Sequence, residues 1–516
     1  MITPYPLGDL VVTPVDLGFP IWVRVSHWFN FLFVTMLVRS GLEILSAHPK
    51  LYWNNASLPG SEWIRFTRKQ MPKDRLWTSK DEEVSFPSWL ALPGGEEKLG
   101  LGRYWHFTSV FGWTLVGLIY FVLLFATDQW RRLVPTSWTI VPDAWRDLVT
   151  YLSFRLPPEG TTANPLSPYN ALQQLSYFAV VFWLTPHMFL TGLAMSPAVE
   201  SRARWYPKLF FGRQPARSLH FLGMVAYLAF LAVHLLMVVV HGLARELTKM
   251  TLGTGHEGDA WLGLALGLVI IGTVTVIHVV ATLASLHAPG LVHRALSALV
   301  DPPRRALLHH LTPVENFPAT EISPYFRVNG YPPTEEYPHT RDDDYIRLQR
   351  GGFADWRLEV SGLVETPLHL SLGDLRAMRR QEQTTMHHCI QGWTAIGRWA
   401  GVPVAEILDR CRPSPEARYL VFHSYQRHEL SGKPYYEVID LETARQPQTI
   451  LAYEMNGVPL PIPHGAPLRL RVENELGFKM VKYLRAIEAV ADYRTVGDGM
   501  GGIREDVQQF DMSAHI

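Results

Sequence analysis

Five long apolar segments dominate the first 290 residues of the chain. They lie at 21–45, 104–126, 171–195, 217–243 and 260–287. Each is long enough to cross a bilayer, which takes about 20 mostly apolar residues in a helix. Arg39 interrupts the first segment, and Pro186 lies in the third, where neighbours can satisfy the carbonyl that a proline frees. The pattern predicts an all-α transmembrane bundle of about five spans over residues 21–290, preceded by an N-terminal extension at 1–20.

The remaining stretches are too polar or too irregular to span a membrane. Residues 46–103 form a long connection that carries several tryptophans, and residues 291–325 form a linker with many prolines and histidines. From 326 to 516 short apolar runs alternate with polar ones, and Ser371 followed by Asp374 is a helix-capping pattern. Strands and helices do not alternate regularly there, which predicts an α+β domain.

Composition and charge narrow the class of protein. The 516 residues suggest about three domain-sized units. The 47 basic and 47 acidic side chains balance, whereas binding to nucleic-acid phosphates needs a basic excess, so we expect no nucleic acid partner. Two cysteines cannot form a disulfide framework. Residues 1–20 lack a basic stretch followed by an apolar one, so no cleavable signal peptide is predicted.

The apolar segments contain several histidines, among them His27, His106, His187, His220, His234, His241 and His278. A ligating or ionisable side chain inside a membrane is costly and therefore suggests a function. A single histidine is nevertheless more often hydrogen-bonded between helices, and we interpret His187, His241 and His278 in that way. His278 could alternatively border a quinone pocket.

The spacing of the other four histidines indicates a shared role. His220 and His234 are 14 residues apart on one predicted helix, which places them within roughly 40° of the same face and about 21 Å apart along the axis. If successive helices alternate in direction, His27 lies level with His234, and His106 level with His220. Histidine is an axial ligand of haem iron, and an iron with two histidines has no open position, so it carries electrons. The four residues predict two stacked haems.

Residues 20–245 resemble the di-haem cytochrome b subunits of formate dehydrogenase and Ni-Fe hydrogenase. The resemblance rests on RVSHW at 24–28, RYWHFTSVFGW at 103–113, TGL at 191–193 and RSLHFLGMVAYLAFLAVH at 217–234. It implies two b haems, with iron held by His27 and His234 and by His106 and His220. The connection at 46–103 departs from the compact family pattern.

Cys389 is the candidate metal ligand of the C-terminal part. A lone cysteine is usually a small buried apolar residue. This one ends a strand-like run, near His387, His388 and Arg398, and basic neighbours favour the thiolate that binds metals. No second cysteine lies close in sequence, which argues against a structural zinc site. One thiolate, with the other ligands supplied by a cofactor, is the arrangement of a molybdenum enzyme.

Residues 315–495 resemble the molybdopterin-binding domain of the sulfite oxidase family, especially the catalytic subunit of methionine-sulfoxide reductases. The motifs are FRVNG at 326–330, LEVSGLVETPLHLSLGDL at 358–375, WAGVPV at 399–404, HGAPLRLRV at 464–472 and GFKMVKYL at 477–484. The resemblance implies that Cys389 binds molybdenum. It also implies that the pterin and its phosphate contact His388, Trp399, His464, Arg469, Lys479 and Lys482. Lysine and arginine suit an anionic phosphate.

The residues that face the substrate are predicted from weaker sequence features. Asn329 and Gln391 are candidates for lining it, although ordinary loop polarity explains them about as well. Cys389 is followed by IQGW, where sulfite oxidases carry an Ala-Gly-Asn-Arg-Arg run. The arginines that would hold an oxyanion such as sulfite are therefore not evident. By analogy, a neutral S-oxide or N-oxide fits better than sulfite.

These features predict a quinone-linked oxidoreductase in the lipid bilayer, with two b haems and molybdopterin as cofactors. Electrons would pass between membrane quinol, the haems and molybdenum, and reduce a small-molecule or protein-bound oxide. After an odd number of spans, the molybdenum domain emerges on the face where His106 and His220 lie. Two alternatives remain: a donor-oxidising, quinone-reducing enzyme of the same architecture, or an electron carrier or sensor whose C-terminal domain binds a partner without catalysis. No obligate partner chain is evident.

The predicted location is the bacterial inner membrane, as a multi-pass protein. The face that carries the molybdenum domain stays open. Export of related soluble enzymes suggests the periplasm. The positive-inside rule leans toward the cytoplasm, because a short loop on the side of that domain is basic. Its cationic residues are Arg202, Arg204, Lys208, Arg213 and Arg217.

Overall fold

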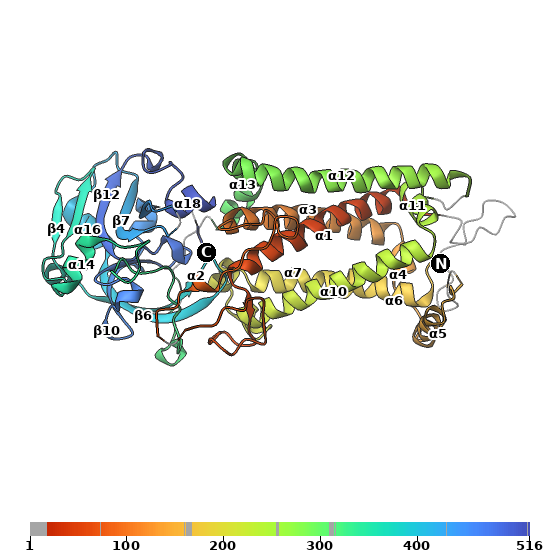
Figure 1. The fold of residues 1–516 in the computed structure, drawn as a ribbon, viewed down its shortest axis with the longest axis horizontal. Helices are drawn as coiled ribbons and strands as arrows, with labels where there is room; N and C mark the ends of the chain where they lie inside the picture. Colours follow the sequence, from red (N-terminus) through yellow and green to blue (C-terminus); the bar gives the residue numbers. More distant parts are fainter. Residues whose placement is uncertain are drawn as a thin grey trace. The chain divides into compact units, whose positions relative to one another are not determined.

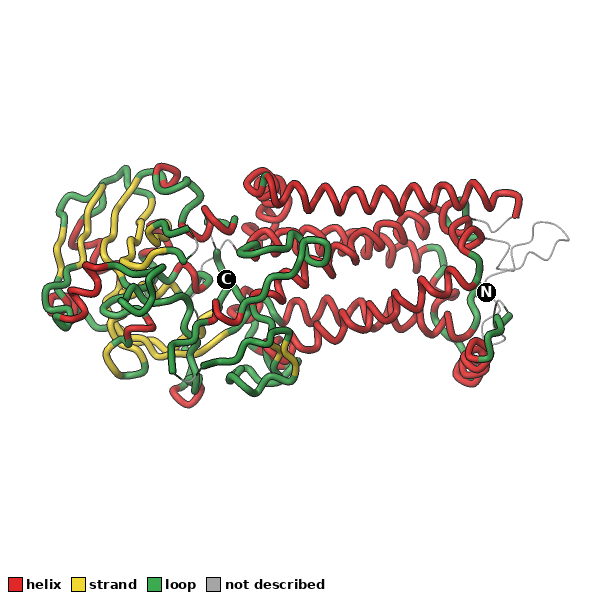
Figure 2. The backbone as a smooth tube through the Cα atoms, in the orientation of Figure 1, coloured by secondary structure: helices red, strands yellow, loops and turns green. Residues whose placement is uncertain are grey.

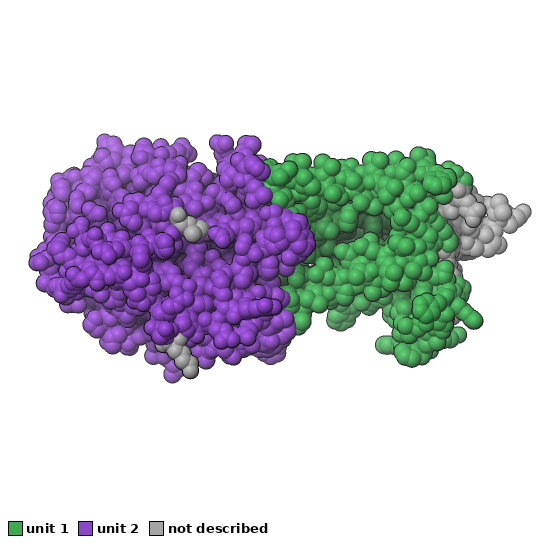
Figure 3. All heavy atoms as spheres, viewed as in Figure 1, with its two compact units in different colours: residues 1–39, 105–193, 219–284 green, residues 40–104, 194–218, 285–516 purple. Residues whose placement is uncertain are grey.

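The chain forms two compact units, which Figure 3 shows in different colours. The computed structural model describes residues 18–516, except 73, 159, 161–167, 254–256, 309–313, 315, 430 and 513. Most of the expected N-terminal extension, residues 1–17, lies outside the described residues. The first unit consists of residues 1–39, 105–193 and 219–284, and the second of residues 40–104, 194–218 and 285–516.

The first unit is a bundle of long helices that lie side by side (Figure 1). The candidate spans are α1 (Ile21–Ala47), α3 (Leu99–Ala126), α6 to α7 (Ala171–Ala194), α10 (Arg213–Val240) and α12 (Ala260–His287). The prediction of five spans is confirmed. Large apolar side chains such as Leu118 and Val269 point outward, with 61% and 65% of their surface exposed. A surface of this kind suits contact with lipid.

The third span contains a local widening of the helix. A π-helix, η1 (Val180–Leu184), separates α6 (Ala171–Ala179) from α7 (Thr185–Ala194). Pro186 lies at the second residue of α7, has no N–H to donate, and its ring crowds the preceding turn. A π-turn is one way in which a helix absorbs such a disturbance. The span therefore accommodates Pro186 without ending.

Short helices connect the spans or extend them. In the first unit these are α4 (Trp130–Leu133), α5 (Ile140–Leu152), α11 (Leu243–Thr251) and the 3₁₀ turn η2 (Glu257–Asp259). In the second unit they are α2 (Ser79–Glu82), α8 (Pro197–Arg202), α9 (Trp205–Lys208) and α13 (Pro289–Leu308). Helix α13 occupies much of the stretch expected to be a linker at 291–325 and continues through Pro302 and Pro303. The connection also holds a small hairpin of β1 (Lys50–Leu51) and β2 (Ile64–Arg65).

Two five-stranded sheets form the C-terminal part of the second unit, where Figure 2 shows the strands gathered. One has the order β10–β9–β6–β5, with β11 also paired to β9, and the other β4–β3–β12–β7–β8. The first comprises β5 (Gln381–His388), β6 (Thr394–Pro403), β9 (Thr449–Met455), β10 (Val458–Pro459) and β11 (Arg469–Val472). The second comprises β3 (Leu358–Gly362), β4 (Leu368–Leu370), β7 (Tyr419–Arg427), β8 (Pro434–Asp440) and β12 (Leu484–Val490). Among these, the β3–β12 pair is parallel and the others are antiparallel.

Short helices complete this α+β arrangement, which confirms the predicted fold class. They are α14 (Asp343–Arg350), α15 (Leu372–Ala377), α16 (Val404–Cys411), α17 (Leu441–Ala444) and α18 (Ile503–Gln508). The same unit also contains the 3₁₀ turns η3 (Ala319–Glu321), η4 (Ile462–His464), η5 (Gly477–Lys479) and η6 (Tyr493–Thr495). Val404, Ile407, Leu408 and Cys411 share one face of α16 and enter the core with strands of both sheets.

Candidate functional site

His27 and His234 face each other across the helical bundle. His27 lies on α1 and His234 on α10, and their ring centroids are 6.0 Å apart with the planes at 62°. A metal–imidazole bond is about 2 Å long, so two rings on opposite sides of one metal ion have centroids about 6 Å apart. The gap between the two rings and the choice of two imidazole donors therefore both fit a haem iron.

The second pair, His106 on α3 and His220 on α10, includes a side chain whose tautomer is fixed by a neighbour. The two histidines are near enough to influence each other electrostatically. Nδ1 of His220 lies 3.0 Å from the hydroxyl of Thr191, and that hydroxyl donates its one proton to the carbonyl of His187 at 2.7 Å. It must therefore accept from Nδ1–H of His220, which leaves Nε2 with the lone pair that a metal needs.

Thr191 therefore gives a testable prediction. Thr191→Val removes the acceptor for Nδ1–H, which makes the imidazole of His220 a weaker electron donor to iron. We expect the midpoint potential of that haem to rise by roughly 20–60 mV, the equivalent of one ordinary hydrogen bond in a one-electron couple. The other haem should keep its potential. An optical redox titration measures both. Thr185→Val, on the same helix, is the control, because the Thr185 hydroxyl bonds the hydroxyl of Tyr227. Equal shifts in the two variants would contradict the assignment.

The three other membrane histidines make hydrogen bonds between helices. Nε2 of His187 lies 3.0 Å from the carbonyl of Leu219, and Nε2 of His241 lies 2.9 Å from the hydroxyl of Tyr151. His278 uses both ring nitrogens, with Nε2 2.9 Å from Thr35 and Nδ1 3.0 Å from Arg39. These contacts agree with the structural interpretation of the three histidines.

Cys389 lies in a tight loop between β5 and β6. Its N–H donates to the carbonyl of Trp393 at 3.1 Å, and the N–H of Gly392 donates to the carbonyl of Cys389 at 3.0 Å. Gly392 has φ +107°, in a region that favours glycine. The sulfur lies between Nδ2 of Asn329 at 3.7 Å and Oε1 of Gln391 at 3.5 Å. The two residues predicted for the substrate side therefore both flank the predicted metal ligand.

The protein alone does not favour the thiolate, contrary to our expectation from the basic neighbours. Burial raises the pKa of the Cys389 thiol to about 12, and this outweighs the lowering by Arg504 and Arg213. Only 2% of the residue is exposed, so desolvation of the charged form dominates. A bound metal ion deprotonates a coordinating thiol outright. The thiol would therefore stay protonated without a metal and would become a thiolate on binding one.

A cationic cavity adjoins the Cys389 loop. Trp393 of that loop and Asn329, which contacts it, line this cavity. The other lining residues include His387, His464, Arg327, Arg469, Lys482 and Arg504. Burial and the nearby Arg469 lower the pKa of Lys482 to about 7. Burial, with Arg471, lowers the pKa of Arg469 to about 9, and its Nε has no hydrogen-bond partner among the described residues. Such buried cations call for an anion, which the phosphate of a pterin cofactor supplies.

Of the residues predicted to contact the pterin, three line this cavity: His464, Arg469 and Lys482. Trp399 lies behind it, beneath the guanidinium carbons of Arg469 and Arg471 at 4.8 and 4.4 Å from the ring centroid. It therefore supports an arginine of the cavity without lining it. His388 is buried, with Nδ1 3.9 Å from a carboxylate oxygen of Glu200, and does not line the cavity either.

Lys479 lies elsewhere. Its ammonium is fully buried, is 3.2 Å from Glu437 and pairs with Glu505. It also donates to the carbonyls of Val438 at 3.0 Å and Gly501 at 3.1 Å. These contacts saturate the ammonium, and Lys479 is not among the residues that line the cavity. The turn η5 ends at Lys479, so the GFKxxK spacing does not bring both lysines to one surface.

Three residues at the sites were not predicted from the sequence: Thr191, Arg327 and Arg504. Thr191 and Arg327 lie within the TGL and FRVNG motifs, so a polar residue inside a motif was the available signal. Arg504 lies past the last motif, on α18, and lines both the cationic cavity and a second cavity. Arg504 reaches these cavities only because the C-terminal segment folds back onto the domain. A local sequence pattern does not predict such a long-range arrangement.

The geometry defines a class of protein: a membrane cytochrome b joined to a molybdenum-cofactor oxidoreductase. Comparison with known families gives the same result. Residues 18–253 match the family described as prokaryotic cytochrome b561, and residues 347–495 match the oxidoreductase molybdopterin binding domain. The chain is a fusion of these two domains, an enzyme whose cofactors are haem b and molybdopterin. The predicted fusion, enzyme class and cofactors are confirmed.

Curated relatives extend this picture. The chain is 34% identical over 185 residues to the putative protein-methionine-sulfoxide reductase subunit YedZ1 of Azospira oryzae. The matched region covers 36% of this chain and 63% of that relative. It is 32% identical over 181 residues to the protein-methionine-sulfoxide reductase catalytic subunit MsrP of Xanthomonas campestris pv. campestris. This second match covers 33% of the present chain and 56% of the relative. The chain thus spans less than two thirds of each relative.

One solved structure shows a weaker likeness. The sulfane dehydrogenase SoxCD of Paracoccus pantotrophus is 24% identical, with a TM-score of 0.25, over 28% of this chain and 41% of that chain. A likeness of this size carries no argument about the present protein.

Proposed function

We propose that the protein is a membrane reductase that takes electrons from quinol and uses them to remove oxygen from an S-oxide or N-oxide. The observation that carries the proposal is the placement of Cys389. Its sulfur is flanked by Asn329 and Gln391, with a cationic cavity on the side of Asn329 and Trp393. The relatives' names support an S-oxide as substrate.

The paired histidines of the membrane helices would hold the electron carriers and would not bind the substrate. Each of the two histidine pairs would hold one haem through both of its imidazoles, and an iron held in this way would have no position open to substrate. His27, His106, His220 and His234 are thus assigned to electron transfer. Each oxide reduced consumes two electrons and two protons, and gives the reduced product and water. Two one-electron haems can collect the two electrons from one quinol.

The soluble residues would hold the cofactor and the substrate. When bound, the molybdenum cofactor would accept the oxygen atom and supply the two electrons that the reduction of the oxide consumes. Cys389 anchors its metal, while Arg469 and Lys482 neutralise its phosphate. The amide of Asn329 is placed to donate a hydrogen bond toward a group beside the sulfur, since its Nδ2 already points at Sγ.

A redox experiment tests the direction of electron flow. Added quinol should reduce the b haems of the purified protein, and methionine sulfoxide or trimethylamine N-oxide should reoxidise them. If no oxide reoxidises the haems while a reduced sulfur donor reduces quinone, the enzyme works in the opposite direction. Full activity in a preparation with full haem content and no molybdenum would exclude the proposal.

The bacterial inner membrane is the proposed location of this multi-pass protein. The five apolar helices and the cytochrome b561 domain support a membrane location. Because the basic loop and the export of related enzymes point to opposite faces, a map of reporter fusions at the chain ends would decide which face carries the molybdenum domain.

A further inference from the structure

Helix α5, in the connection between the second and third spans, exposes large apolar side chains on one side. Four of them each expose between 45% and 71% of their surface: Val141, Trp145, Val149 and Leu152. At about 100° per residue they fall within an arc of roughly 80° around the helix. Trp138, just before α5, and Phe154, just after it, are 89% and 99% exposed. We call these six side chains the α5 apolar face.

The opposite side of α5 is fixed to the ends of two spans. Ile140 and Ala144 are buried against Ala171, the first residue of α6. The hydroxyl of Tyr151 lies 2.9 Å from Nε2 of His241, which directly follows the last residue of α10. Helix α5 is therefore held at the level at which α6 begins and α10 ends.

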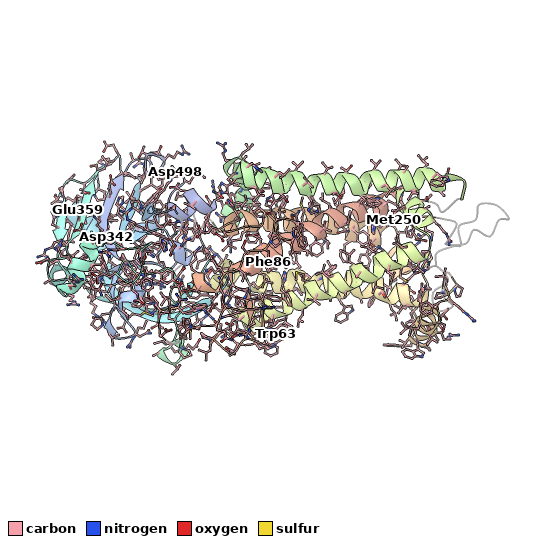
Figure 4. All side chains as sticks on the ribbon, viewed as in Figure 1. Trp63, Phe86, Met250, Asp342, Glu359 and Asp498 are labelled. Carbon is pink, nitrogen blue, oxygen red and sulfur yellow. The ribbon has the colours of Figure 1, made fainter. Side chains whose placement is uncertain are left out.

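Other spans begin at this same end of the bundle. The carbonyl of Met250, which Figure 4 labels, accepts a hydrogen bond at 3.0 Å from Nε1 of Trp28, near the start of α1. Trp261, the second residue of α12, is 83% exposed. Tryptophan is enriched where spans leave the apolar core of a bilayer. Figure 1 shows α5 at this end, crossing the direction of the spans.

Helix α5 is too short to cross the membrane itself. Its 13 residues measure about 20 Å, whereas the hydrocarbon core is about 30 Å thick. Between the α5 apolar face and the side that packs on α6, the helix carries Arg146 and Thr150. The guanidinium of Arg146 is largely exposed and pairs with Asp143. A short helix with one apolar and one polar side lies in the plane of a membrane surface.

We propose that α5 lies in the interfacial layer of the bilayer, with the α5 apolar face inserted between the lipid headgroups and the acyl chains. An exposed apolar patch of this kind marks an interaction site, and its level with the span ends makes a lipid surface the partner. The apolar outer surface of the bundle continues at this end, where Val122 and Phe125 of α3 are also exposed. The rings of Trp138 and Trp145 suit a boundary that is apolar on one side and wet on the other. This membrane contact is additional to the five spans and does not depend on the proposed function.

Spin labels on introduced cysteines test the proposal in the full-length protein, reconstituted in vesicles of phosphatidylethanolamine and phosphatidylglycerol. Val149→Cys places a label on the α5 apolar face, and Arg146→Cys, three residues away on the polar side, is the matched control. The two native cysteines are buried, so the unsubstituted protein should take up little label. Oxygen concentrates among acyl chains and a nickel chelate stays in water. We expect the label at position 149 to meet oxygen, at a depth of about 5–10 Å below the headgroups, and the label at position 146 to meet nickel.

A second pair of variants repeats the comparison further along the helix. Leu152→Cys should behave like Val149→Cys, and Thr150→Cys like Arg146→Cys, because depth must follow the helical period if α5 lies flat. Unchanged b-haem absorption shows that each variant is folded. Equal access of nickel to both members of a pair overturns the proposal, since the α5 apolar face then meets water. Shielding of positions 149 and 152 from both oxygen and nickel also overturns it, since a second copy or another protein then covers the face.

Discussion

Cys389→Ser is expected to abolish oxide reduction, by at least about a thousandfold, while the b-haem absorption spectrum stays unchanged. The thiolate is the protein's ligand to molybdenum in this assignment, and a serine hydroxyl is a harder and far less acidic donor. Cys411 cannot replace it, because it is fully buried in the apolar core of the C-terminal domain. The haems depend on histidines of the separate helical unit. Molybdenum content by elemental analysis, haem content by optical spectrum and turnover with methionine sulfoxide should be measured on one preparation.

Cys411→Ser is the matched control for that experiment. It removes the other thiol of the chain but leaves the loop between β5 and β6 untouched, so activity per molybdenum should equal that of the wild type. Its hydroxyl would be buried among apolar side chains, so some loss of thermal stability is expected. Retained activity in Cys389→Ser would instead favour an electron carrier or sensor whose C-terminal domain binds a partner without catalysis.

Hydropathy predicted the number of spans, because the apolar core of a bilayer sets a minimum length for each apolar segment. The helix ends were less predictable. Helix α10 begins at Arg213, four residues before the expected start at 217. Nε of Arg213 donates to the carbonyl of Met195 at 2.7 Å, and Nε2 of Gln214 donates to the carbonyl of Gly392 at 2.9 Å. Protein partners thus stabilise a polar turn that a hydropathy average counts as unfavourable.

Features that follow from local backbone geometry were easier to predict from the sequence. Ser371 and Asp374 form the predicted capping box at the start of α15, with the N–H of Asp374 donating to the Ser371 hydroxyl at 3.1 Å. The spacing of His220 and His234 likewise follows from the constant rise and rotation of one helix, and the structure brings His234 opposite His27.

Features that depend on long-range packing were not predicted from the sequence. The sequence did not decide whether the connection at 46–103 caps a haem or contacts the C-terminal domain, because its polar residues acquire a role only through contacts with positions near 327 and 391. Lys479 and Lys482 look alike in sequence, yet one is saturated by buried carboxylates and the other lines the cationic cavity. A lysine's partner is a property of the tertiary fold, so a motif alone cannot separate the two.

The histidine pairing predicts how haem content divides among four variants. His27→Ala and His234→Ala should each lose the same spectral component, and His106→Ala and His220→Ala should each lose the other, with about half of the haem remaining in every case. An iron that loses one of two axial imidazoles binds its porphyrin weakly, while the other haem keeps both ligands. Quinol-driven reduction of oxide should fall to near zero in all four, because each removes one carrier from the chain. Haem per protein by pyridine haemochrome, together with a low-temperature spectrum, measures this.

His241→Ala is the control for the pairing, because His241 bonds Tyr151 and lies outside both pairs. It should keep both haems. The decisive comparison is between His27→Ala and His106→Ala: if both lost the same component, the 6.0 Å approach of His27 to His234 would not mark a shared iron. If they lose different components, each haem is held between α10 and a different helix, α1 for one and α3 for the other. Helix α10 is then the common support of both irons, and its His-to-His spacing sets the separation of the two haems across the membrane.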